Sequence, residues 1–292
     1  MIIFKQPLFQ LITSSILLGV GAVFVVFIDL SPTIIAFYRL AIGAVLFFII
    51  LLVQQQRIAS TLPAIGFALL SGAFLGADLS LWNTSILLIG PGIATILNSL
   101  QVFFMAGFGI LFLHDKPTGK LWLSLIITFI GIVLLCSNEL DNNQYGIWGS
   151  SVGVLSGLMF AASMLCLREA VNYQTHSIVN TMFYASIGGV LATGIYGVAA
   201  GLSFVTHELQ SWVMVAIYGS VVHVFAWFLM AKALPQLALA ITGLVMCLEP
   251  VTVFFIDLSL LEKPFVIWQY LGAALTITAI YLGSQSKTKK KS

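Results

Sequence analysis

The two halves of the chain carry the same pattern of residues. The recurring residues are Phe37, Tyr38 and Gly43, which return as Phe183, Tyr184 and Gly189, and Asp115-Lys116-Pro117, which returns as Glu262-Lys263-Pro264. The offsets are 146 and 147 residues in a chain of 292 residues. We therefore expect two copies of one structural unit, residues 1–145 and residues 146–292.

The composition places both copies in a membrane. Hydrophobic residues make up 60% of the chain and charged residues 8%, whereas soluble domains carry about 25% charged residues. A helix needs about 20 apolar residues to cross a bilayer. Ten segments meet this condition: 9–28, 33–53, 62–82, 86–113, 119–137, 146–167, 178–200, 211–231, 236–258 and 264–284.

Each copy holds five of these spans, and this number fixes the relation between the copies. An odd number of crossings reverses the direction of the chain, so the second copy must sit upside down relative to the first. Inverted repeats of this kind are typical of secondary transporters, which bind their substrate at the midplane between the repeats. We predict an all-α membrane protein of ten transmembrane helices in two inverted five-helix repeats.

The basic residues predict the orientation. With the N-terminus inside, ten of the 12 lysines and arginines lie on the inner side: Lys5, Arg57, Lys116, Lys120, Arg168, Lys232, Lys287, Lys289, Lys290 and Lys291. Lys263 alone falls outside, and Arg39 lies within a span. This positive-inside bias predicts a multi-pass protein of the inner membrane with both termini in the cytoplasm.

Several kinds of site have no signature in the sequence. Cys136, Cys166 and Cys247 lack metal-ligand spacing, and no glycine-rich phosphate loop is present. No nucleic-acid signature occurs, because the lysine-rich C-terminus fits an anionic lipid surface better. We expect no metal, no cofactor and no nucleic acid. The expected partners are a small-molecule substrate and the lipid bilayer, with the proton as candidate coupling ion, and both a monomer and a homodimer fit.

The tryptophans all lie within about five residues of a predicted span end, as in the aromatic belt of membrane proteins. They are Trp82, Trp122, Trp148, Trp212, Trp227 and Trp268. For Trp82 and Trp227, stacking against a substrate is the alternative interpretation.

Charged residues inside a membrane are costly and are functional candidates by default. Arg39 lies about 9 Å from the outer end of the second span, at 1.5 Å per residue. Asp78 lies at a similar depth in the third span, so we expect the two side chains to face each other. One interpretation is a structural ion pair. The other makes Arg39 an anchor for a substrate carboxylate and Asp78 an outer gate or proton site.

Glu249 lies near the middle of the ninth span and precedes Pro250. Since proline cannot donate to the carbonyl of Met246, the helix should open there, as in transporters that bind substrate or ions at broken helices. Desolvation favours the neutral form of a buried carboxyl group, which suits a proton carrier. Repair of local hydrogen bonding is the alternative role for Glu249. His223, in the eighth span, is either a structural histidine or a ligand.

Two polar stripes occupy corresponding spans of the two copies. The first comprises Ala94, Asn98, Gln101 and Met105, and the second Thr242, Met246, Glu249 and Val253. Each set recurs at helical spacing and falls on one face. The stripes either line one central cavity or join neighbouring helices. Phe37 and Tyr38 offer further apolar contacts for a substrate.

These residues together resemble the drug/metabolite transporter superfamily, specifically the EamA-type ten-helix exporters. The similarity covers nearly the whole chain and rests on Pro32 with Arg39, on the stretch SGLMFAASMLCLREA and on LEPVTVFFIDLSLLEKPFVIWQYLGAALTITAIYL. The fourth span departs from the family pattern, because NSLQVFF has no proline at the position of Pro250. The corresponding acid is also Asp115 rather than glutamate.

The resemblance implies export of an amino acid or a similar small metabolite by alternating access. The residues are compatible with this cargo, since Arg39 can meet a carboxylate while Glu249 or Asp78 meets an amine. The two intramembrane acids leave a cationic metabolite or drug as an alternative. A membrane enzyme acting on lipid-linked substrates would need a reactive cluster, and the sequence contains none.

Overall fold

The computed structural model describes residues 6–56, 58, 60–89, 94, 97–135, 146–174, 177–260 and 267–285, and these residues form helices and connecting turns without any strand. The α-helices are α1 (Pro7–Val26), α2 (Pro32–Val53), α3 (Leu62–Ile89), α5 (Gln101–Leu113), α6 (Gly119–Leu135), α7 (Gly146–Asn172), α8 (Ile178–Ala199), α9 (Leu209–Ile217), α10 (Trp227–Ala233), α11 (Leu239–Met246), α12 (Leu248–Leu260) and α13 (Ile267–Ser284). A π-helical segment, η3 (Tyr218–Ala226), joins α9 to α10, and a short 3₁₀ helix, η4 (Leu234–Gln236), follows α10.

Most of the described helices are apolar, and some of them also have the length of a membrane span. Five segments are long and apolar enough to cross a bilayer: Pro32–Val53, Leu62–Ile86, Ile147–Asn172, Ile178–Ala199 and Leu209–Gln236. Shorter apolar segments are Pro7–Gly21, Gln101–Leu113, Gly119–Leu134 and Leu239–Val253. Large apolar side chains such as Leu111 and Ile195 are 70% and 69% exposed. The surface of the bundle is therefore suited to hydrocarbon rather than water.

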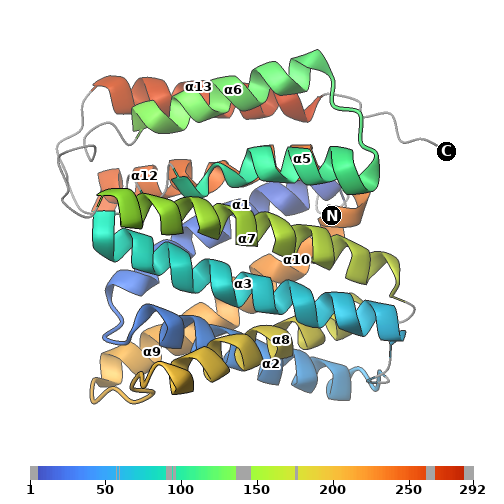
Figure 1. The fold of residues 1–292 in the computed structure, drawn as a ribbon, viewed down its shortest axis with the longest axis vertical. Coiled ribbons are helices and arrows are strands. Elements are labelled where there is room, and N and C mark those ends of the chain that lie inside the picture. Colours follow the sequence, from blue (N-terminus) through green and yellow to red (C-terminus); the bar gives the residue numbers. More distant parts are fainter. Residues whose placement is uncertain are drawn as a thin grey trace.

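The helices pack in layers that mix the two halves of the chain (Figure 1). α6 and α13 lie side by side at one edge, next to α5 and α12, while α2 and α8 lie toward the opposite edge. Between these edges, α3 packs along α7 and α8, and α1 packs against α12, η3 and α10. Prolines at the first positions of α1 and α2 start both helices, where an amide donor has no helical partner.

The third helix is longer than predicted, and this moves the start of the fourth. α3 continues to Ile89 instead of ending at residue 82, so residues 86–89 belong to it and not to the predicted span 86–113. Residues 94, 97 and 98 are helical, ahead of α5. The predicted span also contains Pro91 and Gly92, a pair that favours an irregular helix start, but both lie outside the described residues.

Close approach between helices depends on glycine at specific positions. A Cβ atom at Gly72 in α3 would overlap the carbonyl oxygen of Ala185 in α8. Gly66, two turns earlier in the same helix, has no atom within 4 Å of the corresponding Cβ position. One helix thus carries a glycine that contacts a neighbouring backbone and a glycine that does not.

Replacing these two glycines by alanine should have opposite effects on stability. Gly72→Ala is expected to destabilise the protein by about 1–3 kcal/mol, because backbone atoms must move to make room. Gly66→Ala should be neutral or stabilising by up to about 1 kcal/mol, since alanine favours a helix over glycine. Thermal unfolding of the two purified variants in detergent measures the difference. Equal effects would contradict the proposed close packing of α3 on α8.

Candidate functional site

The ninth span is broken at the point where the sequence predicted an opening. α11 ends at Met246, and α12 begins at Leu248, with Cys247 between them. Glu249 and Pro250 therefore stand in the first turn of α12. The missing amide hydrogen of Pro250 explains the break, because a continuous helix would need that donor for the carbonyl of Met246. The predicted broken helix is confirmed.

The fourth span is interrupted at the corresponding position, although no proline follows the break there. Ser99 and Leu100 form a turn ahead of α5. Leu100 and Cys247 are 147 residues apart, which is the offset between Asp115 and Glu262. A Cβ atom at Gly157 in α7 would lie 2.8 Å from the carbonyl oxygen of Asn98, so the backbone of α7 approaches this turn closely.

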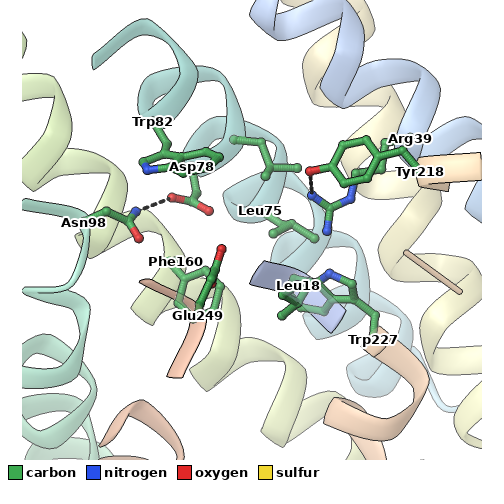
Figure 2. Close-up of a pocket in the computed structure, with 11 residues that line it drawn as sticks. Leu18, Arg39, Leu75, Asp78, Trp82, Asn98, Phe160, Tyr218, Trp227 and Glu249 are labelled. Carbon is green, nitrogen blue, oxygen red and sulfur yellow. Dashed lines mark hydrogen bonds between the residues drawn. The ribbon is translucent and has the colours of Figure 1, made fainter. Parts of the chain in front are cut away.

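A cavity lies where these breaks meet α1, α2, α3, α7 and η3. Its lining residues come from both halves of the chain: Leu18, Arg39, Leu75, Asp78, Leu79, Trp82, Asn98, Phe160, Tyr218, Trp227 and Glu249. We call it the central cavity; its empty volume is about 450 Å³. Figure 2 shows Arg39 and Tyr218 on one side of it and Asp78, Asn98 and Glu249 on the other.

Tyr218 holds the guanidinium group of Arg39. The Nη1 atom of Arg39 donates a hydrogen bond of 2.5 Å to the hydroxyl oxygen of Tyr218. The Arg39 guanidinium carbon also lies 4.5 Å from the centre of the Tyr218 ring. Arg39 is buried, and its Nε atom has no hydrogen-bond partner among the described residues. The guanidinium group therefore keeps unused donors for an anionic ligand.

Asp78 is bound to Asn98 and not to Arg39. The Nδ2 atom of Asn98 donates hydrogen bonds to Oδ1 of Asp78, at 3.2 Å, and to Oγ of Ser156, at 2.6 Å. In the described part of the chain, the ion pair within 4.0 Å joins Arg168 to Asp115, at 3.9 Å. Arg39 and Asp78 line the same cavity, but the interpretation of the two residues as a structural ion pair is wrong. The two residues line one cavity, as their similar predicted depth suggested, but Arg39 is bound by Tyr218 and Asp78 by Asn98.

Glu249 reaches the central cavity from the first turn of α12 (Figure 2). No hydrogen bond to its carboxylate occurs among the described residues, so repair of the broken helix does not explain its position. A second cavity, which we call the side cavity, shares Trp82, Asn98 and Glu249 with the central one and extends to Gln101. Glu249 thus lines both cavities, and its carboxylate has no hydrogen-bond partner among the described residues.

The residues of each predicted polar stripe do not stay on one face, because both helices are broken. Asn98, Gln101, Glu249 and Val253 line the cavities, whereas Met105, Thr242 and Met246 do not. Met105 packs against Gly243, Met246 accepts a hydrogen bond from Ser15, and Thr242 bonds the carbonyl of Ala238 in its own helix. The prediction of two continuous stripes assumed unbroken helices. The breaks change which residues share a face.

His223 and Tyr38 also lie apart from the central cavity. His223 is buried, and its Nε2 atom lies 3.1 Å from Oγ of Ser186, at a small, mainly apolar space behind Trp227. Tyr38 donates a hydrogen bond of 2.7 Å to the carbonyl oxygen of Phe204 and packs on Trp212. Both residues act in packing in this structure.

Two tryptophans, Trp82 and Trp227, line the central cavity. Trp227 is 3% exposed, and its indole nitrogen has no hydrogen-bond partner among the described residues. Figure 2 shows this nitrogen on the side of the ring toward Arg39. Trp82 also lines the cavity, because α3 extends seven residues beyond it to Ile89. The predicted end at residue 82 had placed Trp82 at the interface.

Sequence reasoning missed Tyr218 and Phe160 as lining residues. Tyr218 begins η3, where the helix widens to π-helical hydrogen bonding, and such segments occur frequently at functional sites. A π-helical segment has no recognisable sequence signature. The one available signal for Tyr218 was its place five residues before His223 in an apolar span.

The partners of Asp78 predict how paired substitutions combine. In a double-mutant cycle of stability, Asp78→Ala and Asn98→Ala should be coupled by about 0.5–3 kcal/mol, because they share a buried hydrogen bond. Asp78→Ala and Arg39→Ala share no hydrogen-bond partner and should be closer to additive. Thermal unfolding of the three single and the two double variants measures both coupling energies. Stronger coupling between Asp78→Ala and Arg39→Ala would indicate a direct ion pair between these two residues and contradict the structure.

Comparison with known proteins points to one family. The profile of the EamA-like transporter family matches residues 6–137 and again residues 147–284. Two similar curated proteins, both named pseudopaline exporter CntI, come from Pseudomonas aeruginosa strains UCBPP-PA14 and PAO1. Each is 26% identical to this chain over 147 residues, which is 50% of this chain and 50% of the relative.

The match therefore spans half the length of these relatives. A solved crystal structure shares the fold, with a TM-score of 0.78 at 12% identity, and the superposition covers 94% of this chain and 95% of the other. This similarity concerns the arrangement of the helices.

Proposed function

Because the chain belongs to the EamA-like transporter family, we propose that it is a secondary transporter that carries an amino acid or a similar small metabolite by alternating access. The chain is an integral membrane protein of the transporter class, as its family and its apolar spans indicate. We place it in the inner membrane with both termini in the cytoplasm. The excess of basic residues on one side of the predicted spans supports this orientation.

The observation that carries the proposal is the division of charge in the central cavity. Arg39 and the Trp227 indole offer hydrogen-bond donors on one side, and Asp78 and Glu249 offer carboxylates on the other. A zwitterionic amino acid presents a carboxylate and an ammonium group, which complement these two sides. Phe160, Trp82 and Leu75 supply apolar contacts for the remainder of the molecule.

The packing of the helices supports two inverted repeats. The most extensive contacts between the halves have counterparts with the halves exchanged: α3 packs on α7 as the eighth span packs on α1, and α5 packs on α7 as α11 and α12 pack on α1. α2 with α8, α5 with α11 and α6 with α13 pair equivalent helices. These contacts fit a pseudo-two-fold axis, and five spans per copy put that axis in the membrane plane.

We further propose exchange of a proton for the substrate amine at Glu249. A carboxylate without a hydrogen-bond partner in a buried cavity is stabilised either by a proton or by a cation. Binding of the substrate ammonium therefore favours release of the proton, and departure of the substrate favours its return. Outward transport of the substrate is the proposed direction, in keeping with the relatives named as exporters.

A carrier of cationic metabolites or drugs is the second candidate. Two carboxylates and one guanidinium group line the central cavity, together with the aromatic rings of Trp82, Phe160, Tyr218 and Trp227. Acidic and aromatic groups together favour an organic cation without a carboxylate. Such a substrate would not need Arg39.

Uptake into proteoliposomes tests the proposal. Purified protein should transport at least one labelled amino acid from a panel, and a pH gradient should change the rate. Competition by unlabelled compounds separates the candidates, because amino acids should compete better than the amines that lack their carboxylate. Competition by organic cations alone would favour the second candidate, and no transport of any panel member would contradict the amino-acid proposal.

A further inference from the structure

The side cavity combines a carboxylate with amide side chains. It lies beside the breaks in the fourth and ninth spans, has an empty volume of about 310 Å³, and is lined by Trp82, Asn98, Gln101 and Glu249 among others. We propose that it binds a compact cation, either the primary ammonium group of a substrate or an alkali metal ion. Both ligands have the same requirement, a small positive centre surrounded by oxygen atoms.

Gln101, which lines the side cavity, has an unsatisfied oxygen acceptor. Its side chain is 3% exposed, and its Oε1 atom is buried without a hydrogen-bond partner among the described residues. A buried acceptor left unsatisfied costs about 1–3 kcal/mol. An ammonium group or a metal ion in the side cavity would remove that penalty.

Asn98 provides a second oxygen acceptor. Its Nδ2 atom donates to Asp78 and to Ser156, so both amide hydrogens are in use. The Asn98 side chain therefore has only its carbonyl oxygen to offer to the cavities that it lines. Asp78 and Ser156 thereby act as positioning residues for that oxygen.

Glu249 supplies the charge. In the described part of the chain, no basic side chain lines the side cavity. Arg39 lines the central cavity and is not among the residues of the side cavity. A carboxylate and two amide oxygens, with no cation among them, form a ligand set of oxygen atoms. Such sets select hard cations and hydrogen-bonding ammonium groups over bulky ones. A quaternary ammonium ion cannot donate hydrogen bonds to Gln101 or Asn98.

The proposal deepens the proposed function, because it assigns the substrate amine or a coupling ion to a defined place. A role of this cation site in transport rests on the proposed function, whereas binding of a cation to the site does not. The two can therefore fail separately.

Thermal unfolding of the full-length protein in detergent, without any substrate, tests the site. The probes are methylammonium chloride, sodium chloride and tetramethylammonium chloride at equal ionic strength. Methylammonium or sodium should raise the unfolding midpoint by about 2 °C or more relative to tetramethylammonium, as expected when a ligand binds only the folded state. Gln101→Leu should lose this shift. Glu249→Gln, which keeps the shape of the side chain, should lose it as well and serves if the leucine variant does not fold.

Gln236→Leu is the matched control, because Gln236 is exposed and its Nε2 atom donates a hydrogen bond to the carbonyl oxygen of Lys232 in α10, away from both cavities. It should keep the full shift. A shift with methylammonium alone identifies the substrate amine as the occupant, and a shift with sodium identifies an alkali metal ion. Equal midpoints in all three salts, or a shift that both Gln101→Leu and Glu249→Gln retain, would overturn the proposal. If the shift occurs but no amino acid is transported, the cation site stands and the proposed function fails.

Discussion

Replacing Glu249 by glutamine is expected to abolish substrate-driven proton movement in proteoliposomes while the protein remains folded. The amide keeps the size and much of the hydrogen-bonding capacity of the carboxyl group, but it cannot release a proton or neutralise an ammonium group. Glu249 is the acid that faces both cavities without a fixed partner, whereas Asp78 is held by Asn98. Its loss should therefore affect coupling most.

A pH-sensitive dye inside the vesicles measures this effect when substrate is added outside. Glu208→Gln provides the matched control, because Glu208 is exposed ahead of α9 and should leave proton movement unchanged. Unchanged, pH-dependent transport by the Glu249→Gln variant would reject the proposed role. Asp78 and His223 would then become the candidates for the proton carrier.

Replacing Arg39 by alanine should reduce transport of substrates that carry a carboxylate. Hydrogen bonds to charged groups contribute about 1.5–3 kcal/mol, which corresponds to a fall of about 10- to 150-fold in kcat/KM. Transport of an amine that lacks the carboxylate should change less, since Arg39 has no contact to offer it. The ratio of the two rates therefore reports recognition of the carboxylate.

Tyr218→Phe distinguishes recognition from positioning. The variant keeps the ring beneath the guanidinium group but removes the oxygen that accepts the 2.5 Å hydrogen bond. A smaller loss than that of Arg39→Ala is expected, with the same preference among substrates. Equal losses for carboxylate-bearing and carboxylate-free substrates in Arg39→Ala would mean that Arg39 serves folding only.

The sequence alone predicted the features that depend on composition and on single backbone constraints. Hydrophobic runs identified the apolar spans, and Pro250 predicted the break at Cys247 because its missing donor acts locally. The cost of charge in a membrane correctly drew attention to Arg39, Asp78 and Glu249, all of which line the central cavity.

The remaining features depend on how helices contact each other. The hydrogen bonds of Arg39 to Tyr218 and of Asp78 to Asn98 join residues 179 and 20 positions apart, so depth alone could not predict them. The break at Ser99 and Leu100 occurs without a proline, beside the close approach of Gly157. The π-helical segment that begins at Tyr218 likewise has no sequence signal.

Counterflow tests the central claim, that one site in this cavity serves both faces of the membrane in turn. Vesicles containing the protein are loaded with an unlabelled amino acid from the transported panel and diluted into a trace of the labelled compound. A carrier with alternating access should accumulate the label transiently above its outside concentration, and Arg39→Ala should lose this overshoot. Label that never exceeds its outside concentration, at a rate independent of loading, would contradict the account.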